Sequence, residues 1–296
     1  MKRILSKIAL GCMITAGLTA CTDWLDVNTD PDNPNNKSLL VSNRLPWIQR
    51  MYMYSAGMTN FRTAATAGWL YSNGWSVNTC TTTWNFANGL TTGPYQTWFV
   101  ESASNLNDLY EKAKEDGAYH YMAAADVYYA LGFMEMLDLY GEIPFTDALS
   151  SSPVPKYDDG KTIYNGIMAK IDEAIELFGK TQSATATPLA NGDVLNGGDV
   201  SKWLKMCYGL KARYMLKLSK KSDLFKPDEI LQCLSHGPQS VDDNSVLPCY
   251  NAIGDVTDYL YGDPVQTNGN WDYAGYGSNQ RVSSYLYNLL TNMRGA

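Results

Sequence analysis

Aromatic rings beside amide and hydroxyl groups are the side chains of this 296-residue sequence that could act together chemically. Residues 63–100 contain no Asp, Glu, Lys or Arg, yet they hold nine threonines and four of the eight tryptophans. A saccharide presents hydroxyls around an apolar ring face, and Trp combines a flat apolar body with a polar tip. We therefore predict a saccharide-binding site built from Trp75, Trp84, Asn73, Asn78 and Asn85.

A second aromatic stretch, residues 250–279, spaces tyrosines and one tryptophan with glycines. Trp271 and Tyr273 are further ligand candidates, and the carboxylate of Asp272 could accept hydrogen bonds from sugar hydroxyls. Any of the candidate aromatic residues could instead pack in the core or contact a partner protein, because protein interfaces are also enriched in Trp and Tyr.

Pairs of carboxylates are the other groups with catalytic potential, since glycoside hydrolases place two of them across a cleft and raise the pKa of one. Glu135 and Asp138 lie three positions apart on an expected helix, and Asp158 and Asp159 are adjacent in an expected loop. Neither pair has an identifiable partner, so we expect both on a solvated surface. Serine-hydrolase, P-loop and zinc-peptidase motifs are absent from the sequence. We interpret the protein as non-catalytic.

The histidines and cysteines lack the spacing of a metal site. Only His120 and His236 occur, and the sequence has no Cys-x-x-Cys or His-x-x-x-His pattern, so we expect no metal and no cofactor. An exported compartment would permit disulfides, although a domain of this size does not require them. The cysteines outside the N-terminal segment are Cys80, Cys207, Cys233 and Cys249.

The N-terminus has the pattern of an export signal. Three basic residues precede an uncharged run at 8–18, which is too short to span a bilayer. Residues 18–21, Leu-Thr-Ala-Cys, resemble the lipobox of bacterial lipoproteins, in which the cysteine thiol receives a diacylglyceryl group. We predict a signal peptide over 1–20, lipidation of Cys21 and a Pro-rich and Asn-rich tether over 21–37. An ordinary secretory signal is the alternative.

Charge excludes two classes of partner. The sequence has 23 basic and 30 acidic side chains, and removal of the signal peptide takes three basic ones, which leaves 20 against 30, a net charge of about −10. Nucleic-acid binding needs clustered Lys and Arg, and electrostatic membrane binding needs a polybasic patch. We therefore expect the protein to bind no nucleic acid. We expect it to associate with the membrane through its acyl chains alone, each buried CH₂ of which contributes ~0.8 kcal/mol to binding.

Helical periodicity dominates the rest of the sequence, and strand signals are weak. The first helix is expected to start near Ser38 and to be interrupted or restarted at Pro46. Thr162 should cap a later helix, and Asp199 or Ser201 the next. Trp98 and Trp203 are expected in the core. Further expected helices cover residues 97–116, 118–140, 162–178, a segment from 199 or 201, 227–235 and 281–292.

The intervening stretches 63–100 and 250–279 are expected to be long loops, which compact domains rarely contain unless the loops are functional. The sequence therefore predicts an all-α domain over 38–296, in which paired helices are joined by long irregular loops.

Three segments of the sequence carry a combined signature. Residues 137–145 read Leu-Asp-Leu-Tyr-Gly-Glu-Ile-Pro-Phe, and residues 196–214 contain Gly-Asp, Lys-Trp and Leu-x-x-Arg. The third segment is the lipobox with Asp-Trp-Leu-Asp at 23–26 and Asp-Pro at 30–31. Together they resemble the SusD/RagB family, surface glycan-binding lipoproteins of Bacteroidetes-type nutrient uptake, in which the first segment is a helix end and turn and the second a helix. Within these motifs we expect structural roles, including a left-handed cap at the glycine and a helix stop at the proline, for Tyr140, Gly141, Pro144, Asp199, Trp203 and Arg213.

The resemblance implies an α fold of tetratricopeptide-like helix pairs whose irregular loops hold the ligand. It also implies a lipid-anchored protein on the outer face of the outer membrane that captures oligosaccharides and delivers them to a SusC-like, TonB-dependent transporter. RagB-like relatives take peptides, so peptide capture is the alternative, with a surface glycoside hydrolase or adhesin less favoured. Residues 281–284 resemble a segment well inside family members. We therefore expect the sequence to be the N-terminal portion of a longer protein, whose C-terminal part adds ligand contacts.

Overall fold

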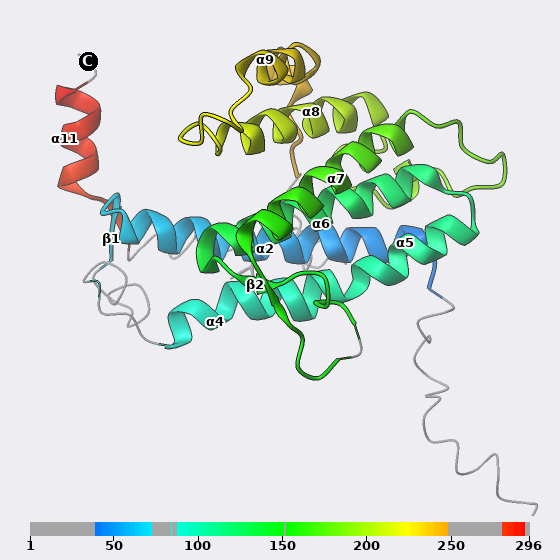
Figure 1. Cartoon of the computed structure of the whole chain (residues 1–296), viewed down its shortest axis with the longest axis horizontal. Helices are drawn as coiled ribbons and strands as arrows, with labels where there is room; N and C mark the ends of the chain where they lie inside the picture. The colour runs from blue at the N-terminus through cyan, green and yellow to red at the C-terminus, as the bar shows by residue number, and fades with distance from the viewer. Residues whose placement is uncertain (1–38, 73–83, 85–87, 151, 248–279, 294–296) are drawn as a thin grey trace, which may run out of the picture. The chain divides into compact units, whose positions relative to one another are not determined.

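The computed structural model describes residues 39–72, 84, 88–150, 152–247 and 280–293. The chain separates into two units, residues 1–39 and 40–296, and the second holds every element described below. Its described residues are mainly helical, so the prediction of an all-α fold is confirmed (Figure 1). The α-helices are α2 (Val41–Thr66), α4 (Asn88–Gln96), α5 (Leu106–Glu115), α6 (Tyr119–Tyr140), α7 (Gly160–Phe178), α8 (Val200–Leu216), α9 (Pro227–His236) and α11 (Ser284–Asn292).

Short elements connect these helices. A π-helix over Thr97–Ser102 and a 3₁₀ turn over Ala103–Asn105 join α4 to α5, and further 3₁₀ turns cover Leu189–Asn191 and Val241–Asp243. Two antiparallel strand pairs are present among the described residues. They are β1 (Leu70–Ser72) with β4 (Gln280–Val282), where Leu70 pairs with Val282, and β2 (Ile143–Pro144) with β3 (Tyr157–Asp158).

Helix α6 lies at the centre of the core. Its residues 121–128 are all buried, so the helix is covered on every side, as expected for a helix that is largely apolar around its circumference. Helices α5 and α7 pack on α6, α8 packs on α7, and α9 packs on α8 (Figure 1). Trp98 and Trp203 are fully buried, and Gly132 on α6 leaves the space that the Trp98 ring fills.

Helix α2 runs without a break through Pro46, so the expected interruption there is wrong. A proline in the second turn of a helix lacks the N–H that would bond four residues back. Burial of Leu45 and Ile48, on either side of Pro46, in the core offsets that loss. The helix extends to Thr66, further than the sequence predicts.

Other boundaries also differ. Helix α4 starts at Asn88, so the expected loop over 63–100 is helical at both ends. The cap of α7 is Asp159, whose Oδ1 accepts hydrogen bonds from the backbone N–H groups of Lys161 and Thr162, rather than Thr162. Residues 280–282 form β4 because they pair with β1, a partner more than 200 positions away that helical periodicity does not reveal.

One buried carboxylate connects three parts of the core. Asp193 Oδ1 accepts hydrogen bonds from Gln49 Nε2 on α2 at 2.9 Å and from the N–H groups of Leu195 and Asn196. Asp193 Oδ2 accepts from Gly198 N–H at 2.9 Å and from Trp203 Nε1 on α8 at 2.7 Å. Five donors thus converge on a side chain of a residue that is only 4% exposed.

Candidate functional site

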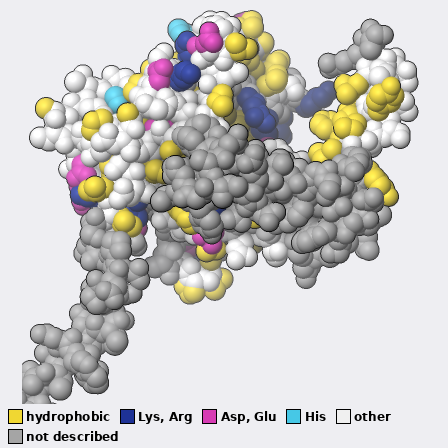
Figure 2. All heavy atoms as spheres, turned by 180° about the vertical axis from the view of Figure 1, so that it is seen from behind, with side chains coloured by type: hydrophobic (Ala, Val, Ile, Leu, Met, Phe, Trp, Pro, Cys, Tyr) yellow, Lys and Arg dark blue, Asp and Glu magenta, His cyan; other side chains and the backbone are white. Residues whose placement is uncertain are grey.

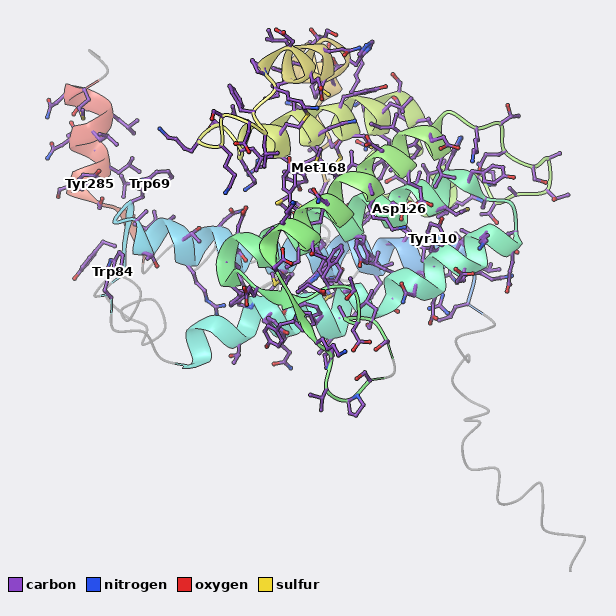
Figure 3. The ribbon with its side chains drawn as sticks, viewed as in Figure 1. Trp69, Trp84, Tyr110, Asp126, Met168 and Tyr285 are labelled. Carbon is purple, nitrogen blue, oxygen red and sulfur yellow. The ribbon has the colours of Figure 1, made fainter. Side chains whose placement is uncertain are left out.

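Exposed aromatic side chains gather where β1 meets β4 and α11. We call Trp69, Tyr71, Trp84 and Tyr285 the aromatic surface; their exposed fractions are 48, 52, 66 and 60%. Figure 3 labels Trp69, Trp84 and Tyr285 around β1 and the start of α11. Large aromatic residues are normally well buried, so four of them exposed around one short strand pair mark a candidate binding surface.

The end of α2 fixes the position of Trp69. Gly68 has φ +73°, a left-handed conformation that glycine adopts without strain. The N–H of Gly68 bonds Ala65 O, and the N–H of Trp69 bonds Ala64 O at 2.9 Å, so the chain turns sharply out of the helix. Trp69 therefore stands at the helix end with its ring half exposed.

Ser283 brings α11 to the same place. Its N–H bonds Trp69 O at 3.0 Å and its hydroxyl donates to Gly68 O, while Oγ accepts the N–H of Leu286 and so caps α11. A serine at this position satisfies one of the free N–H groups of the first helical turn. Tyr285 lies in that turn, two residues after Ser283. Figure 2 shows hydrophobic side chains gathered over the α11 segment.

Trp84 is the predicted ligand residue that the structure describes. Its indole Nε1 donates to Thr66 O at 3.1 Å, at the C-terminal end of α2. Its φ is +58°, which is uncommon for a bulky residue and costs conformational energy. An exposed ring fixed by a hydrogen bond and an unfavourable backbone conformation is a typical feature of a binding site.

The remaining predicted ligand residues lie outside the described residues, as does the predicted lipidation site. They are Asn73, Trp75, Asn78, Asn85, Trp271, Tyr273 and Cys21. Conversely, sequence reasoning did not select Trp69, Tyr71 or Tyr285. The signal for Trp69 was its place after a helix-ending glycine in the charge-free stretch, whereas Tyr285 joins the surface only through the long-range pairing of β4.

The residues of the family-like motifs are distributed over helix ends. Gly141 has φ +75° and its N–H bonds Leu137 O at 3.0 Å, but its ψ of −118° is outside the left-handed helical region, which corrects the expected cap geometry. Pro144 pairs with Tyr157 in the β2–β3 ladder. Tyr140 packs edge-on against Tyr95, with ring centroids 5.5 Å apart.

The second family-like motif lies on α8. Asp199 is the N-cap of this helix and accepts the N–H groups of Ser201 and Lys202. Trp203 donates its indole N–H to Asp193, as described above, and is fully buried. Arg213 is exposed and lines a cavity of about 300 Å³ between α2, α6 and α8.

Of the four carboxylates expected on a solvated surface, Asp138 and Asp159 are exposed and Asp158 is partly exposed, whereas Glu135 differs. Glu135 lines the same cavity as Arg213, and burial raises its pKa to about 7, so its expected solvation is wrong. Asp138, one turn away, is exposed and pairs with Lys217 Nζ at 2.5 Å. Asp158 accepts the N–H groups of Phe145 and Thr146, hydrogen bonds that lower its pKa and give it a structural role.

Metal-ligand clusters and membrane-spanning helices are not found in the described residues. Within them, no group of three or more His, Cys, Asp or Glu side chains is placed to hold a metal ion. No helix in this part of the chain combines the length and apolarity needed to cross a membrane.

Comparisons with known proteins identify relatives. The SusD-like family described as "Starch-binding associating with outer membrane" matches residues 42–294. A SusD/RagB family protein of Bacteroides thetaiotaomicron matches with a TM-score of 0.70 and 19% identity, over 87% of this chain and 53% of that one. A Bacteroidetes SusD-like protein matches with a TM-score of 0.69 and 21% identity, over 87% of this chain and 49% of that one. A chitin-binding protein matches with a TM-score of 0.66 and 20% identity, over 86% of this chain and 53% of that one.

The chain spans about half the length of these solved structures. At these identities the structural likeness shows a shared fold, and the family match rests on the sequence. No curated protein sequence matches the chain.

Proposed function

This chain belongs to the SusD-like family, and from that membership we propose that it captures oligosaccharides at the aromatic surface without cutting them. The exposure of Trp69, Tyr71, Trp84 and Tyr285 around one strand pair is the observation that carries the proposal. Flat rings can cover the apolar face of a sugar, and the indole and phenol groups can hydrogen-bond its hydroxyls. One of the structural relatives is described as a chitin-binding protein, which supports a glycan as the ligand class.

We further propose the cellular setting of this capture. Acyl groups on Cys21 would hold the protein on the outer membrane with its body at the cell surface, because several chains anchor stably where one binds reversibly. From there the protein would deliver oligosaccharides to a SusC-like, TonB-dependent transporter. The family description, which names association with the outer membrane, supports this location.

Replacement of Trp84 by alanine tests the aromatic surface. We expect Kd for the bound glycan to rise about 5- to 10-fold, because an aromatic contact contributes roughly 1 kcal/mol. Affinity electrophoresis of the purified protein in gels containing soluble starch or glycol chitin measures this change. The thermal transition should change little, since the Trp84 side chain is exposed.

Trp47→Ala is the matched control for this experiment. Trp47 is also partly exposed, and its Nε1 also donates to a backbone carbonyl, Glu101 O at 2.9 Å, but it lies on α2 away from β1. Retention should be unaffected by this change. Equal loss of retention in both variants, or release of reducing ends by the wild-type protein, would contradict the proposed capture. Binding of peptides but not glycans would point to the RagB-like alternative.

Replacement of Cys21 by alanine tests the lipid anchor. Without the thiol that receives the diacylglyceryl group, the protein should move from the membrane fraction to the soluble fraction of fractionated cells. Cys207→Ala is a suitable control, because Cys207 is a buried thiol of the α8 core. Membrane association that persists in Cys21→Ala would refute lipidation, while leaving the glycan-binding proposal to its own test.

A further inference from the structure

A polar cavity between α5, α6 and α7 is independent of the aromatic surface. Its volume is about 330 Å³, and the side chains that line it and carry polar groups are Asn107, Tyr110, Glu111, Asp126, Tyr129 and Lys170. Figure 3 labels Tyr110 on α5 and Asp126 on α6 close together. Asn107 and Glu111 are exposed and form the mouth, whereas the others lie deeper.

The inner wall is a preformed network of hydrogen bonds. Lys170 Nζ lies 2.8 Å from Asp126 Oδ1 and 2.9 Å from Glu173 Oε2, and it sits 4.8 Å above the centre of the Tyr110 ring. The Tyr110 hydroxyl donates to Glu173 Oε1. Lys170, Tyr110 and Glu173 therefore hold one another, and only part of this network faces the cavity.

Asp126 is the unusual member of the wall. Its side chain is 3% exposed, and its Oδ2 accepts no hydrogen bond from the described residues. A buried carboxylate oxygen without a donor is energetically costly, so most such atoms in proteins have a partner. The terminal torsion of an aspartate is broad, so a small rotation can turn an oxygen towards a donor in the cavity. Tyr129 also lines the cavity, so its hydroxyl too can bond a ligand.

The charge of the wall indicates the kind of donor. Asp126 Oδ1 already forms an ion pair with the Lys170 ammonium, so a ligand cation bound to the same carboxylate would lie next to a like charge. A hydroxyl group supplies a donor without that repulsion. The tyrosine rings and the apolar side chains of Leu106 and Ala125 complete the lining and suit a ring with apolar faces.

We propose that this cavity binds one neutral, hydroxyl-rich ring of monosaccharide size, with Asp126 accepting a ligand hydroxyl and Tyr129 hydrogen-bonding a second. Its volume is near the lower end of the ~300–1,000 Å³ of small-molecule sites, which fits a single ring rather than a chain. The site lies on helices rather than on β1 and α11. It would therefore act separately from capture of the polymer at the aromatic surface.

Protonation of Asp126 should weaken the interaction. Burial raises the pKa of Asp126 to about 7, against the opposing effect of Lys170, so the carboxylate becomes neutral as the pH falls below this value. A hydrogen bond to an ionised acceptor is about twice as strong as one to a neutral acceptor. Affinity should thus be higher at pH 8 than at pH 5.5. The titratable or charged groups that face Asp126 are Tyr110 and Glu111 of α5, Tyr129 of α6, Lys170 and Glu173 of α7, and Cys207 of α8.

Calorimetric titration of the purified protein with D-glucose, D-xylose and N-acetyl-D-glucosamine tests the site. We expect at least one of these sugars to bind, with affinity reduced roughly 3- to 10-fold in Tyr129→Phe, the effect of losing one hydrogen bond. Asp126→Asn should reduce affinity more than 10-fold and remove its dependence on pH. Tyr129→Phe should leave retention in gels that contain soluble starch or glycol chitin unchanged, which separates this site from the aromatic surface.

Asp172→Asn is the control, because it removes an ion pair with Lys211 from the same helix α7 without touching the cavity. Affinity should be unchanged in this variant. The proposal is overturned if no sugar binds at about 50 mM, if binding survives both Tyr129→Phe and Asp126→Asn, or if tetramethylammonium binds in place of the sugars. Should Asp126→Asn fail to fold, Tyr129→Phe alone decides, since it keeps the ring and the Asp126–Lys170 pair.

Discussion

Replacement of Asp193 by alanine is expected to lower the free energy of unfolding by about 3–5 kcal/mol. The change removes the acceptor for five hydrogen bonds, including those from Gln49 Nε2 and Trp203 Nε1. These donors would remain buried without a partner, and each buried unsatisfied group costs roughly 1–3 kcal/mol. The loss is expected to fall short of the sum of these costs, because the loop over 194–198 can relax towards water.

Denaturant unfolding followed by far-UV circular dichroism measures this change. The free energy of unfolding of Asp193→Asn should lie between those of the wild type and Asp193→Ala, since the amide oxygen can still accept some of the hydrogen bonds. Asp223→Ala is the matched control, because Asp223 is an exposed acidic residue beyond α8 and its removal should change stability by less than about 0.5 kcal/mol. A loss below about 1 kcal/mol in Asp193→Ala would show that Asp193 does not organise the core.

Replacement of Gly132 by alanine should also destabilise the protein, by about 3 kcal/mol. A Cβ at this position of α6 would collide with three atoms of the Trp98 ring. Both residues are buried, so the ring can move only by displacing other core side chains. Overpacking of this kind typically costs 1–3 kcal/mol, and the higher helix propensity of alanine recovers only part of it.

Gly57→Ala provides a control with the opposite expected sign. Gly57 is also inside a helix, α2, but a Cβ there would meet no described atom within 4 Å. Without a collision, alanine should stabilise the protein by about 0.4–1 kcal/mol. Thermal melting of the two variants in parallel therefore isolates steric overlap from helix propensity. Similar melting temperatures for both would mean that the Trp98 ring does not fill the space above Gly132.

The helices of the core follow from local sequence patterns. Residues 118–140 and 162–178 are almost the same as α6 and α7, because apolar periodicity and the glycines at 141 and 179 define them. Pro46 misled the prediction, because a local rule for proline does not include the burial of Leu45 and Ile48. Asp193 could not be identified either, since its five donors come from α2, a loop and α8.

The aromatic surface was only partly predictable. The charge-free stretch directed attention to Trp75 and Trp84 near its centre, and Trp84 is exposed, while its role in binding stays a prediction. Tyr285 was assigned to a helix with no link to Trp69, because pairing of β1 with β4 depends on contacts that sequence periodicity does not encode. The burial of Glu135 could not be predicted from local sequence either, because it depends on α2 and α8 as well as on its own helix.

The pairing of β1 with β4 has a consequence for the order of folding. Ser283 bonds Gly68 across a separation of 215 residues, whereas the helix pairs between them form contacts close in sequence. Closing a long loop carries a larger entropic cost than forming local contacts, and chains fold more slowly when such contacts dominate. During synthesis the core helices can therefore pack before residue 280 emerges. The aromatic surface is then the last part of the described fold to assemble, and a chain released before β4 would hold a formed core without it.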